Sequence, residues 1–153
     1  MVARTAVALL ALWLGAADAS LEVEDAAGGR LTLALGAGER ALVVHFWASW
    51  CPECGEELPG LERALRGCPA EVRVLAVNVA ESTDVARRFL ERHNSALPLY
   101  RDPEGRVWRR LARGLPANLI WTRASRRTEV GPKNPSEWHG LLESLGCRSM
   151  TIP

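Results

Sequence analysis

Two cysteines separated by two residues, Cys51 and Cys54, are the side chains in this sequence best suited to chemistry. Their spacing puts the two sulfurs about one helical turn apart, close enough to form a disulfide with each other. The thiolate form of cysteine attacks disulfides, and a helix N-terminus favours the thiolate because its unpaired N–H groups and its dipole present positive charge. The pair therefore predicts thiol–disulfide exchange, provided that Cys51 lies at the start of a helix.

The patterns on either side of the cysteines predict that placement. An apolar run over 41–47 indicates a buried strand, and we expect the strand to end at Trp50 and leave Cys51 in the first turn of a helix. Leucines then recur at helical spacing, with Pro59 inside the pattern as an expected kink. The residues Gly-Cys-Pro at 67–69 should end this helix.

The rest of the sequence alternates between strand and helix patterns. The expected elements are an N-terminal β-hairpin from 21–23 and 31–33, strands at 72–79 and 97–100, helices after Ser82 or Thr83 and at 106–113, a hairpin of 119–121 and 128–130, and a last helix capped by Asn134 and ended by Gly146. This order predicts an α/β domain with a central mixed sheet flanked by helices.

Length and charge narrow the class of protein. The chain has 153 residues, enough for one domain with a hydrophobic core. Its net charge of +1 argues against a nucleic-acid partner, because nucleic-acid binding needs a concentrated positive field.

The first residues have the layout of a secretory signal peptide. A short basic start precedes an apolar stretch over 6–17, and Ala17-Asp18-Ala19 fits a small-x-small cleavage site. The apolar stretch is shorter than the roughly 20 residues of a transmembrane helix. We therefore expect residues 1–19 to be removed and residues 20–153 to form the domain, with retention as a membrane anchor as the alternative. Export would place the protein in the periplasm or another extracytoplasmic compartment, where disulfides persist.

Two stretches of the sequence resemble one protein family. The order βαβ then ββα is that of a thioredoxin fold, and VVHFWASWCPECGEELPGL, over 43–61, resembles the strand, Trp-Cys-x-x-Cys and Glu-Leu-Pro helix of the exported TlpA/ResA-like thiol–disulfide oxidoreductases. About sixty residues later, Asp-Pro-Glu-Gly at 102–105 and Arg-Gly-Leu-Pro at 113–116 resemble that family's insert and its Gly-x-Pro loop. The likeness runs from roughly Leu21 to Leu145.

The resemblance implies roles for the residues around the cysteines. Cys51 would be the exposed nucleophile and Cys54 the resolving cysteine, which releases the mixed disulfide. Pro116 would be the cis-proline that faces the pair, and the Leu115 backbone would be offered to an extended substrate segment. The expected substrate-binding residues are Trp50, Pro52, Glu53, Leu115 and Pro116.

Two residues near the cysteines suggest how this chain tunes the chemistry. His45 stands where thioredoxins carry a buried acid; it is a candidate proton relay for Cys54, and the alternative is a buried neutral imidazole bonded to backbone. The negative charge of Glu53 should oppose the helix dipole and disfavour the Cys51 thiolate. A less stabilised thiolate makes the reduced form less favoured, so we expect a reductant.

The remaining cysteines, Cys68 and Cys147, each follow the end of an expected helix. In a thioredoxin fold these two helices lie on one face of the sheet and run away from the active-site edge. We therefore expect a structural Cys68–Cys147 disulfide, with free or separately buried thiols as the alternative. It would close most of the domain.

The expected function is disulfide exchange with exported, disulfide-containing proteins, with reduction of apocytochrome c during cytochrome c maturation as the common task among relatives. An upstream membrane thiol reductase would recharge the pair. A disulfide-forming oxidant and a Cu(I) carrier remain alternatives, since two thiolates can hold Cu(I). Zinc is disfavoured because the sequence has no second Cys-x-x-Cys or His-x-His pair, and we expect no metal and no cofactor.

Overall fold

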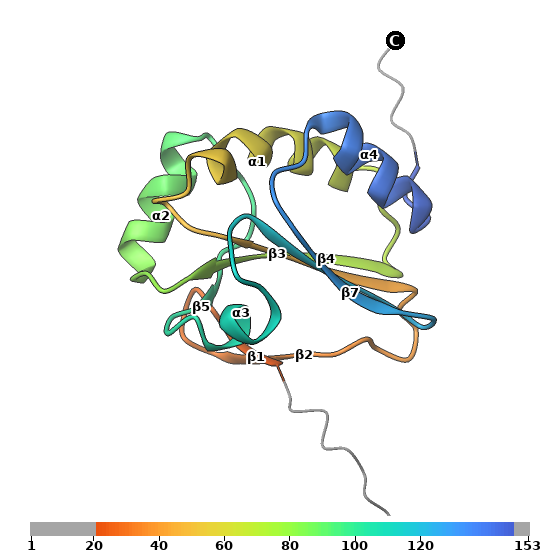
Figure 1. Cartoon of the computed structure of the whole chain (residues 1–153), viewed down its shortest axis with the longest axis horizontal. Coiled ribbons are helices and arrows are strands. Elements are labelled where there is room, and N and C mark those ends of the chain that lie inside the picture. Colours follow the sequence, from red (N-terminus) through yellow and green to blue (C-terminus); the bar gives the residue numbers. More distant parts are fainter. Residues whose placement is uncertain (1–20, 149–153) are drawn as a thin grey trace, which may run out of the picture.

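A seven-stranded mixed sheet forms the centre of the computed structural model, which describes residues 21–148 (Figure 1). The strand order is β2-β1-β5-β4-β3-β6-β7. The strands are β1 (Leu21–Asp25), β2 (Arg30–Leu33), β3 (Ala41–Trp47), β4 (Val72–Val79), β5 (Tyr100–Asp102), β6 (Ala117–Thr122) and β7 (Arg126–Val130). The helices are α1 (Pro52–Leu65), α2 (Thr83–Arg92), α3 (Arg106–Leu111) and α4 (Pro135–Ser144).

The strand β3 is an inner strand of the sheet and is buried along its whole length. It pairs in parallel with β4 and antiparallel with β6, as expected for a parallel core that a C-terminal hairpin completes. Trp47 at the end of β3 is opposite Asn78 of β4. The loops that follow these two strands therefore leave the sheet at the same edge.

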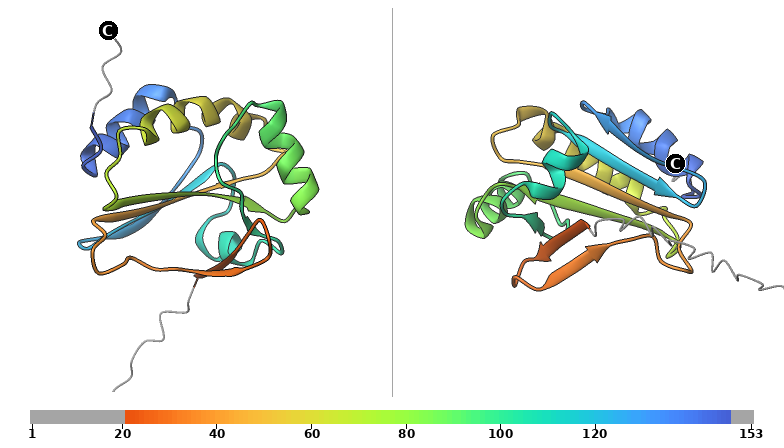
Figure 2. Two further views of the ribbon diagram at one scale, coloured as in Figure 1. Left: turned by 180° about the vertical axis from the view of Figure 1, so that it is seen from behind. Right: turned by 60° about the horizontal axis from the view of Figure 1, so that its bottom comes forward.

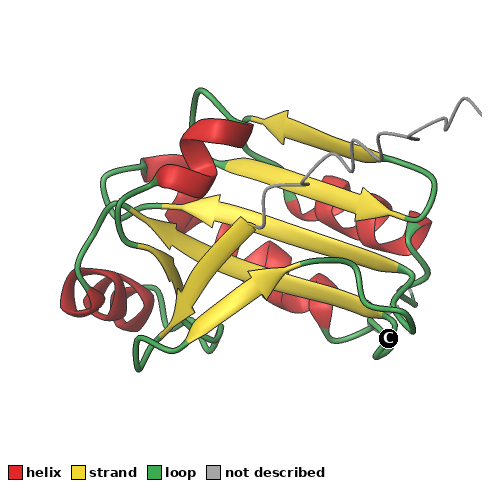
Figure 3. Ribbon diagram, turned by 90° about the horizontal axis from the view of Figure 1, so that it is seen from below, coloured by secondary structure: helices red, strands yellow, loops and turns green. Residues whose placement is uncertain are grey.

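Helices cover the two faces of the sheet unequally (Figures 1 and 2). The helices α1, α2 and α4 lie on one face, where Leu61 of α1 and Trp138 of α4 pack on Val43 of β3. The short helix α3 lies on the other face, where it contacts β1 and β5 (Figures 1 and 3). Side chains of β3 point alternately to the two faces of the sheet. Val44 and Phe46 point to the face of α3 and belong to the core cluster that contains its Val107. The expected α/β architecture with an N-terminal hairpin is confirmed.

Side-chain caps begin α2 and α4 where the sequence predicts them. The Ser82 side chain accepts a hydrogen bond from the Val85 N–H at the start of α2. Asn134 and Glu137 form a capping box at the start of α4. Both caps were expected, and both are confirmed.

Three element boundaries differ from the expectation. The strand β3 ends at Trp47, and the Cys51 N–H donates to the Ala48 carbonyl at 3.2 Å, so a turn precedes the helix. The strand β5 covers Tyr100–Asp102 in place of 97–100, because it pairs with the last residues of β4. The helix α3 ends at Leu111, which leaves residues after it to form the loop that leads to β6.

The predicted signal segment, residues 1–19, lies outside the described residues. Within residues 21–148, none of the helices has the length and apolar composition needed to cross a bilayer.

Candidate active site

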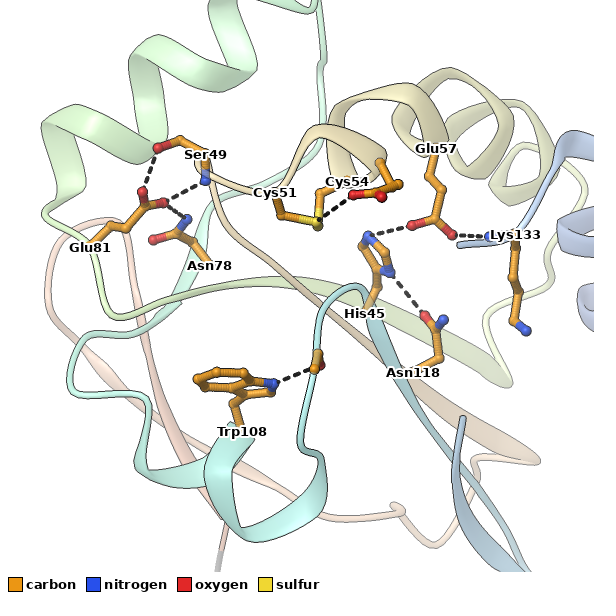
Figure 4. Close-up of a disulfide and its surroundings, with 12 residues drawn as sticks. His45, Ser49, Cys51, Cys54, Glu57, Asn78, Glu81, Trp108, Asn118 and Lys133 are labelled. Atoms are coloured by element: carbon orange, nitrogen blue, oxygen red, sulfur yellow. Dashed lines mark hydrogen bonds and ion pairs between the residues drawn. A yellow bond between two sulfur atoms is a disulfide. The ribbon is translucent and has the colours of Figure 1, made fainter. Parts of the chain in front are cut away.

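The redox pair lies at the start of α1, directly after the turn that follows β3 (Figure 4). Cys51 is the N-cap residue, Pro52 is the first helical residue, and a disulfide joins Cys51 to Cys54 with an S–S distance of 2.19 Å. Cys51 is 4 % exposed, whereas Cys54 is fully buried. Of the two sulfurs, the one at the N-cap is therefore the one that a partner reaches first.

Aromatic and loop residues border the pair. Trp50 is 58 % exposed, and its ring lies 6.4 Å from that of Trp108 in an edge-to-face arrangement. The Trp108 indole N–H donates to the Gly114 carbonyl at 3.0 Å, which fixes the loop before β6. In that loop the Leu115–Pro116 peptide bond is cis, and Leu115 packs against the cluster that holds both cysteines. Trp50 and the loop thus flank the pair.

Glu53 is exposed, and one of its carboxylate oxygens lies 4.0 Å from the Cys51 sulfur. A carboxylate at that distance repels a thiolate and therefore disfavours it. Pro52 beside it is exposed as well, so both residues between the cysteines are accessible to a partner.

His45 of β3 is fully buried beneath the pair. Its Nδ1 lies 2.9 Å from the Asn118 side-chain oxygen, so the imidazole N–H donates to that oxygen. Burial lowers the pKa of His45 to about 4, with the nearby positive charge of Lys133 acting in the same direction. The imidazole is neutral near pH 7, and its partner is a side-chain amide, whereas the alternative to a proton relay had a backbone partner.

Glu57 is a buried carboxyl group that the sequence analysis missed. It is 3 % exposed, and one carboxyl oxygen accepts a hydrogen bond from the Lys133 backbone N–H at 2.6 Å. The other oxygen lies 3.9 Å from His45 Nε2. Burial raises the pKa of Glu57 to about 7, against the lowering effect of the hydrogen bond from Lys133. Its spacing offered a signal, because Glu57 follows Cys54 by three positions and so shares the inward face of the helix.

The facing atoms of His45 and Glu57 are suited to hold one proton. Neither His45 Nε2 nor Glu57 Oε2 has a hydrogen-bond partner within the described part of the chain. With the proton of His45 on Nδ1, its Nε2 offers a lone pair toward Glu57. A hollow of about 360 Å³ beside Glu57, lined by Glu53 and Lys133 among others, leads from this carboxyl group toward solvent. The pair can therefore take up or release a proton next to the cysteines.

At the other end of α1, a disulfide joins Cys68 to Cys147, just beyond the C-terminus of α4. These are the two cysteines that the sequence analysis named as a structural pair. In residues 21–148, no group of three or more His, Cys, Asp or Glu side chains is arranged to hold a metal ion.

Comparison with known proteins identifies a family and several relatives of this chain. A family model described as the AhpC/TSA family matches residues 15–127. The sporulation thiol-disulfide oxidoreductase A of Bacillus subtilis is 30 % identical over 69 residues, which cover 42 % of this chain and 42 % of the relative. The thiol-disulfide oxidoreductase ResA of Bacillus subtilis is 28 % identical over 86 residues, covering 56 % of this chain and 48 % of the relative. The chain thus spans less than half the length of these relatives.

Solved structures share the fold over most of the chain. A secreted Mycobacterium tuberculosis disulfide oxidoreductase, homologous to E. coli DsbE, superposes with a TM-score of 0.69 at 21 % identity and covers 80 % of this chain and 94 % of its own. StoA from Bacillus subtilis gives a TM-score of 0.65 at 20 % identity, with 80 % and 95 % covered. At these identities the likeness shows a common fold.

Proposed function

The chain belongs to the AhpC/TSA family, as a TlpA/ResA-like member of the thioredoxin superfamily, and we propose that it is a thiol–disulfide oxidoreductase. Its substrates are exported proteins that contain disulfides, and Cys51 and Cys54 carry the exchange. The observation that carries the proposal is the Cys51–Cys54 disulfide at the N-terminus of α1, with Cys51 at the surface end. That position supplies the N–H groups and the helix dipole that a reactive thiolate needs.

The reaction begins with both cysteines reduced. The Cys51 thiolate attacks one sulfur of the substrate disulfide, the substrate S–S bond breaks, and the other substrate sulfur leaves as a thiolate that takes a proton from water. Cys54 then loses its proton and attacks the Cys51 sulfur, which releases the second substrate thiolate. Two electrons pass from the cysteine pair to the substrate, and the product is the Cys51–Cys54 disulfide.

The second step needs a group that accepts the proton of Cys54. Glu57 lies one helical turn from Cys54, and a carboxyl group with a pKa of about 7 can accept a proton at neutral pH. His45 faces Glu57 at 3.9 Å, which supports a relay in which His45 acts on Cys54 through Glu57. His45 is thus a positioning residue for the carboxyl group in this proposal.

The proposed direction is reduction of the partner. The carboxylate of Glu53 beside the Cys51 sulfur disfavours the thiolate, and a disfavoured thiolate makes the pair a milder oxidant. An oxidising compartment would leave the pair as a disulfide, so an upstream membrane thiol reductase must return it to the reduced form. By analogy with relatives, apocytochrome c in cytochrome c maturation is a fitting partner.

Trapping of mixed disulfides tests the exchange. A Cys54→Ala variant cannot resolve the intermediate, so it should hold partner proteins from periplasmic extracts in reducible complexes through Cys51. The matched control is Cys51→Ala, which keeps Cys54 and should hold none. A Cu(I) carrier would give no complexes from either variant and would bind one Cu(I) per cysteine pair in the unmodified protein.

The equilibrium with glutathione tests the direction. A reductant is expected to stay largely oxidised in a glutathione mixture that reduces a strong oxidant. If the Cys51–Cys54 pair is instead reduced as readily as in disulfide-forming oxidants, the exchange runs in the opposite direction and the chain makes disulfides in its partners.

A further inference from the structure

The turn that presents Cys51 is bonded to a distant carboxylate. Ser49, two residues before Cys51, donates its backbone N–H to Glu81 Oε2 at 2.9 Å, and its hydroxyl group donates to Glu81 Oε1 (Figure 4). Glu81 comes from the loop between β4 and α2, and 32 positions of sequence separate it from Ser49. Because β3 and β4 pair in register, their loops meet at one edge of the sheet and the two residues lie side by side.

Glu81 is itself held from two other strands. The side-chain amide of Asn78, which is 1 % exposed, donates to Glu81 Oε2 at 2.6 Å. Arg101 of β5 donates to the Glu81 backbone carbonyl at 3.2 Å and forms an ion pair with Glu24 of β1 at 3.6 Å. Ala80 next to Glu81 adopts a φ of 56°, the left-handed region that non-glycine residues seldom adopt. The carboxylate therefore has a fixed place and accepts three hydrogen bonds.

The rest of the turn depends on this carboxylate for its position. The turn is closed by the Cys51 N–H bond to the Ala48 carbonyl at 3.2 Å, and the adjoining Trp50 side chain is largely exposed. Among the hydrogen bonds of residues 21–148, those from Ser49 to Glu81 are the ones that tie the turn to another part of the sheet edge.

We propose that Glu81 is a positioning residue for disulfide exchange, which clamps the turn through Ser49 and so sets the direction in which the Cys51 sulfur attacks. The inference rests on the proposed function, since it names how that site is held. Exchange needs the attacking sulfur in line with the two sulfurs of the substrate, so a displaced nucleophile loses rate even when it is ionised. The carboxylate acts through its hydrogen bonds, because its negative charge alone would oppose the thiolate.

The test uses a Cys54→Ala background, in which the Cys68–Cys147 disulfide is intact and Cys51 is the sole free thiol. Glu81→Ala and Ser49→Ala are each added, singly and together, and the rate of Cys51 with a small aromatic disulfide is followed against pH. Each profile gives the pKa of Cys51 and the limiting rate constant of its thiolate. We expect the limiting rate constant to fall about tenfold in Glu81→Ala and by less in Ser49→Ala. The double variant should fall no further than Glu81→Ala, because the two residues act as one unit.

Glu91→Ala is the matched control, since Glu91 is an exposed carboxylate of α2 and should leave the rate constant unchanged. Circular dichroism at the assay temperature establishes that every variant is folded. A lower melting temperature with an unchanged limiting rate constant would overturn the proposal in favour of a structural role alone. A lower Cys51 pKa with an undiminished limiting rate constant would overturn it in favour of a charge effect.

The two proposals fail in different ways. If the unmodified protein exchanges with no protein disulfide, the proposed function fails, while the small-disulfide rates still measure the clamp. If it exchanges with protein disulfides and Glu81→Ala reacts as fast, only the clamp is wrong.

Discussion

Burial moves the pKa values of His45 and Glu57 in opposite directions, to about 4 and about 7. The unfolded chain binds the His45 proton up to about pH 6.5, so this residue makes stability rise with pH between about 4 and 6.5. Glu57 keeps its proton longer in the folded chain, so its contribution falls with rising pH between about 4.5 and 7. The two contributions change the free energy of unfolding in opposite directions over most of this range. They therefore largely cancel in the unmodified protein.

Single substitutions should expose each slope. In Glu57→Gln, the melting temperature is expected to rise with pH from 4 to 6.5, because the His45 contribution remains alone. In His45→Asn, it is expected to fall with pH from 4.5 to 7, because the Glu57 contribution remains alone. For one proton, the free energy of unfolding changes by at most about 1.4 kcal/mol per pH unit in either variant. Calorimetry at fixed ionic strength measures both, and two variants with parallel profiles would contradict the pKa assignments.

The charge of Glu53 should set the redox equilibrium of the pair. Glu53→Gln removes a carboxylate 4.0 Å from the Cys51 sulfur, so the pKa of Cys51 is expected to fall and the reduced form to gain. The equilibrium with glutathione should shift several-fold toward the reduced pair, up to about tenfold at this distance. Glu56→Gln, an exposed residue two positions after Cys54, is the control. An equal shift in both variants would mean that the general field and not the neighbouring charge sets the potential.

At the scale of elements, the Cys68–Cys147 disulfide ties the C-terminal ends of α1 and α4 together across 79 positions of sequence. A cross-link of that span restricts the unfolded chain by roughly 4–5 kcal/mol in the chain-entropy model. The paired substitution Cys68→Ala with Cys147→Ala should therefore lower the free energy of unfolding by up to about that amount. Urea denaturation measures the loss, with Cys51 and Cys54 kept oxidised in both proteins.

The same variant should keep its exchange activity when folded, because this disulfide lies at the opposite end of α1 from Cys51. Mass spectrometry of unreduced peptides from the unmodified protein provides the direct check. A Cys68 peptide that alkylates without prior reduction would show that the two sulfurs are not joined.

Element positions were predictable where local chemistry decides them. The caps at Ser82 and Asn134 are formed by side chains within four residues of the backbone groups they satisfy, so the sequence reports them. The bounds of β5 depend on its register with β4, in which paired residues are 23 positions apart. A local sequence pattern does not contain that register. The Arg-rich segment 106–113 has Val107 packed inward and its arginines outward, as expected for a solvated helix face.

At the scale of the whole molecule, β1 joins the N-terminal hairpin to the rest of the sheet. It pairs with β2 on one side and β5 on the other. Its Leu21 and Val23 are buried in the core cluster that also contains Val107 of α3. A chain that begins at Ser20 keeps every strand of this sheet, so its melting temperature should equal that of the full-length protein. Thermal denaturation of the two proteins tests this. N-terminal sequencing of the protein recovered after expression of the full-length sequence tests cleavage after Ala19.

A chain that begins at Arg30 provides the contrast. It lacks β1, which leaves β2 without its partner and exposes apolar core. Burial of each such side chain is worth about 1.5–3 kcal/mol, so stability should fall by several kcal/mol. A melting temperature equal to that of the full-length protein would mean that the hairpin is not an integral part of the domain.

The fold and the redox pair could be predicted from the sequence because both are signalled by contiguous patterns. The residues that tune the pair are brought to it by long-range register. His45 meets Asn118 across 73 positions, and Lys133 meets Glu57 across 76. Glu81 reaches Ser49 in the same way. A single sequence signals which side chains are polar, but it does not report which of them share an edge of the sheet.

Lys133 has a consequence of a different kind, because it is the only lysine in the sequence. Its backbone N–H is bonded to the buried Glu57, its ammonium group lies 2.7 Å from Glu129, and it lines the hollow beside the redox pair. Reagents that acylate amines will therefore modify Lys133 and the α-amino group, because the sequence has no other lysine. A dye or an isotope attached to Lys133 becomes a single reporter at the wall of the hollow beside Glu57, and it needs no engineered cysteine that would compete with the native thiols.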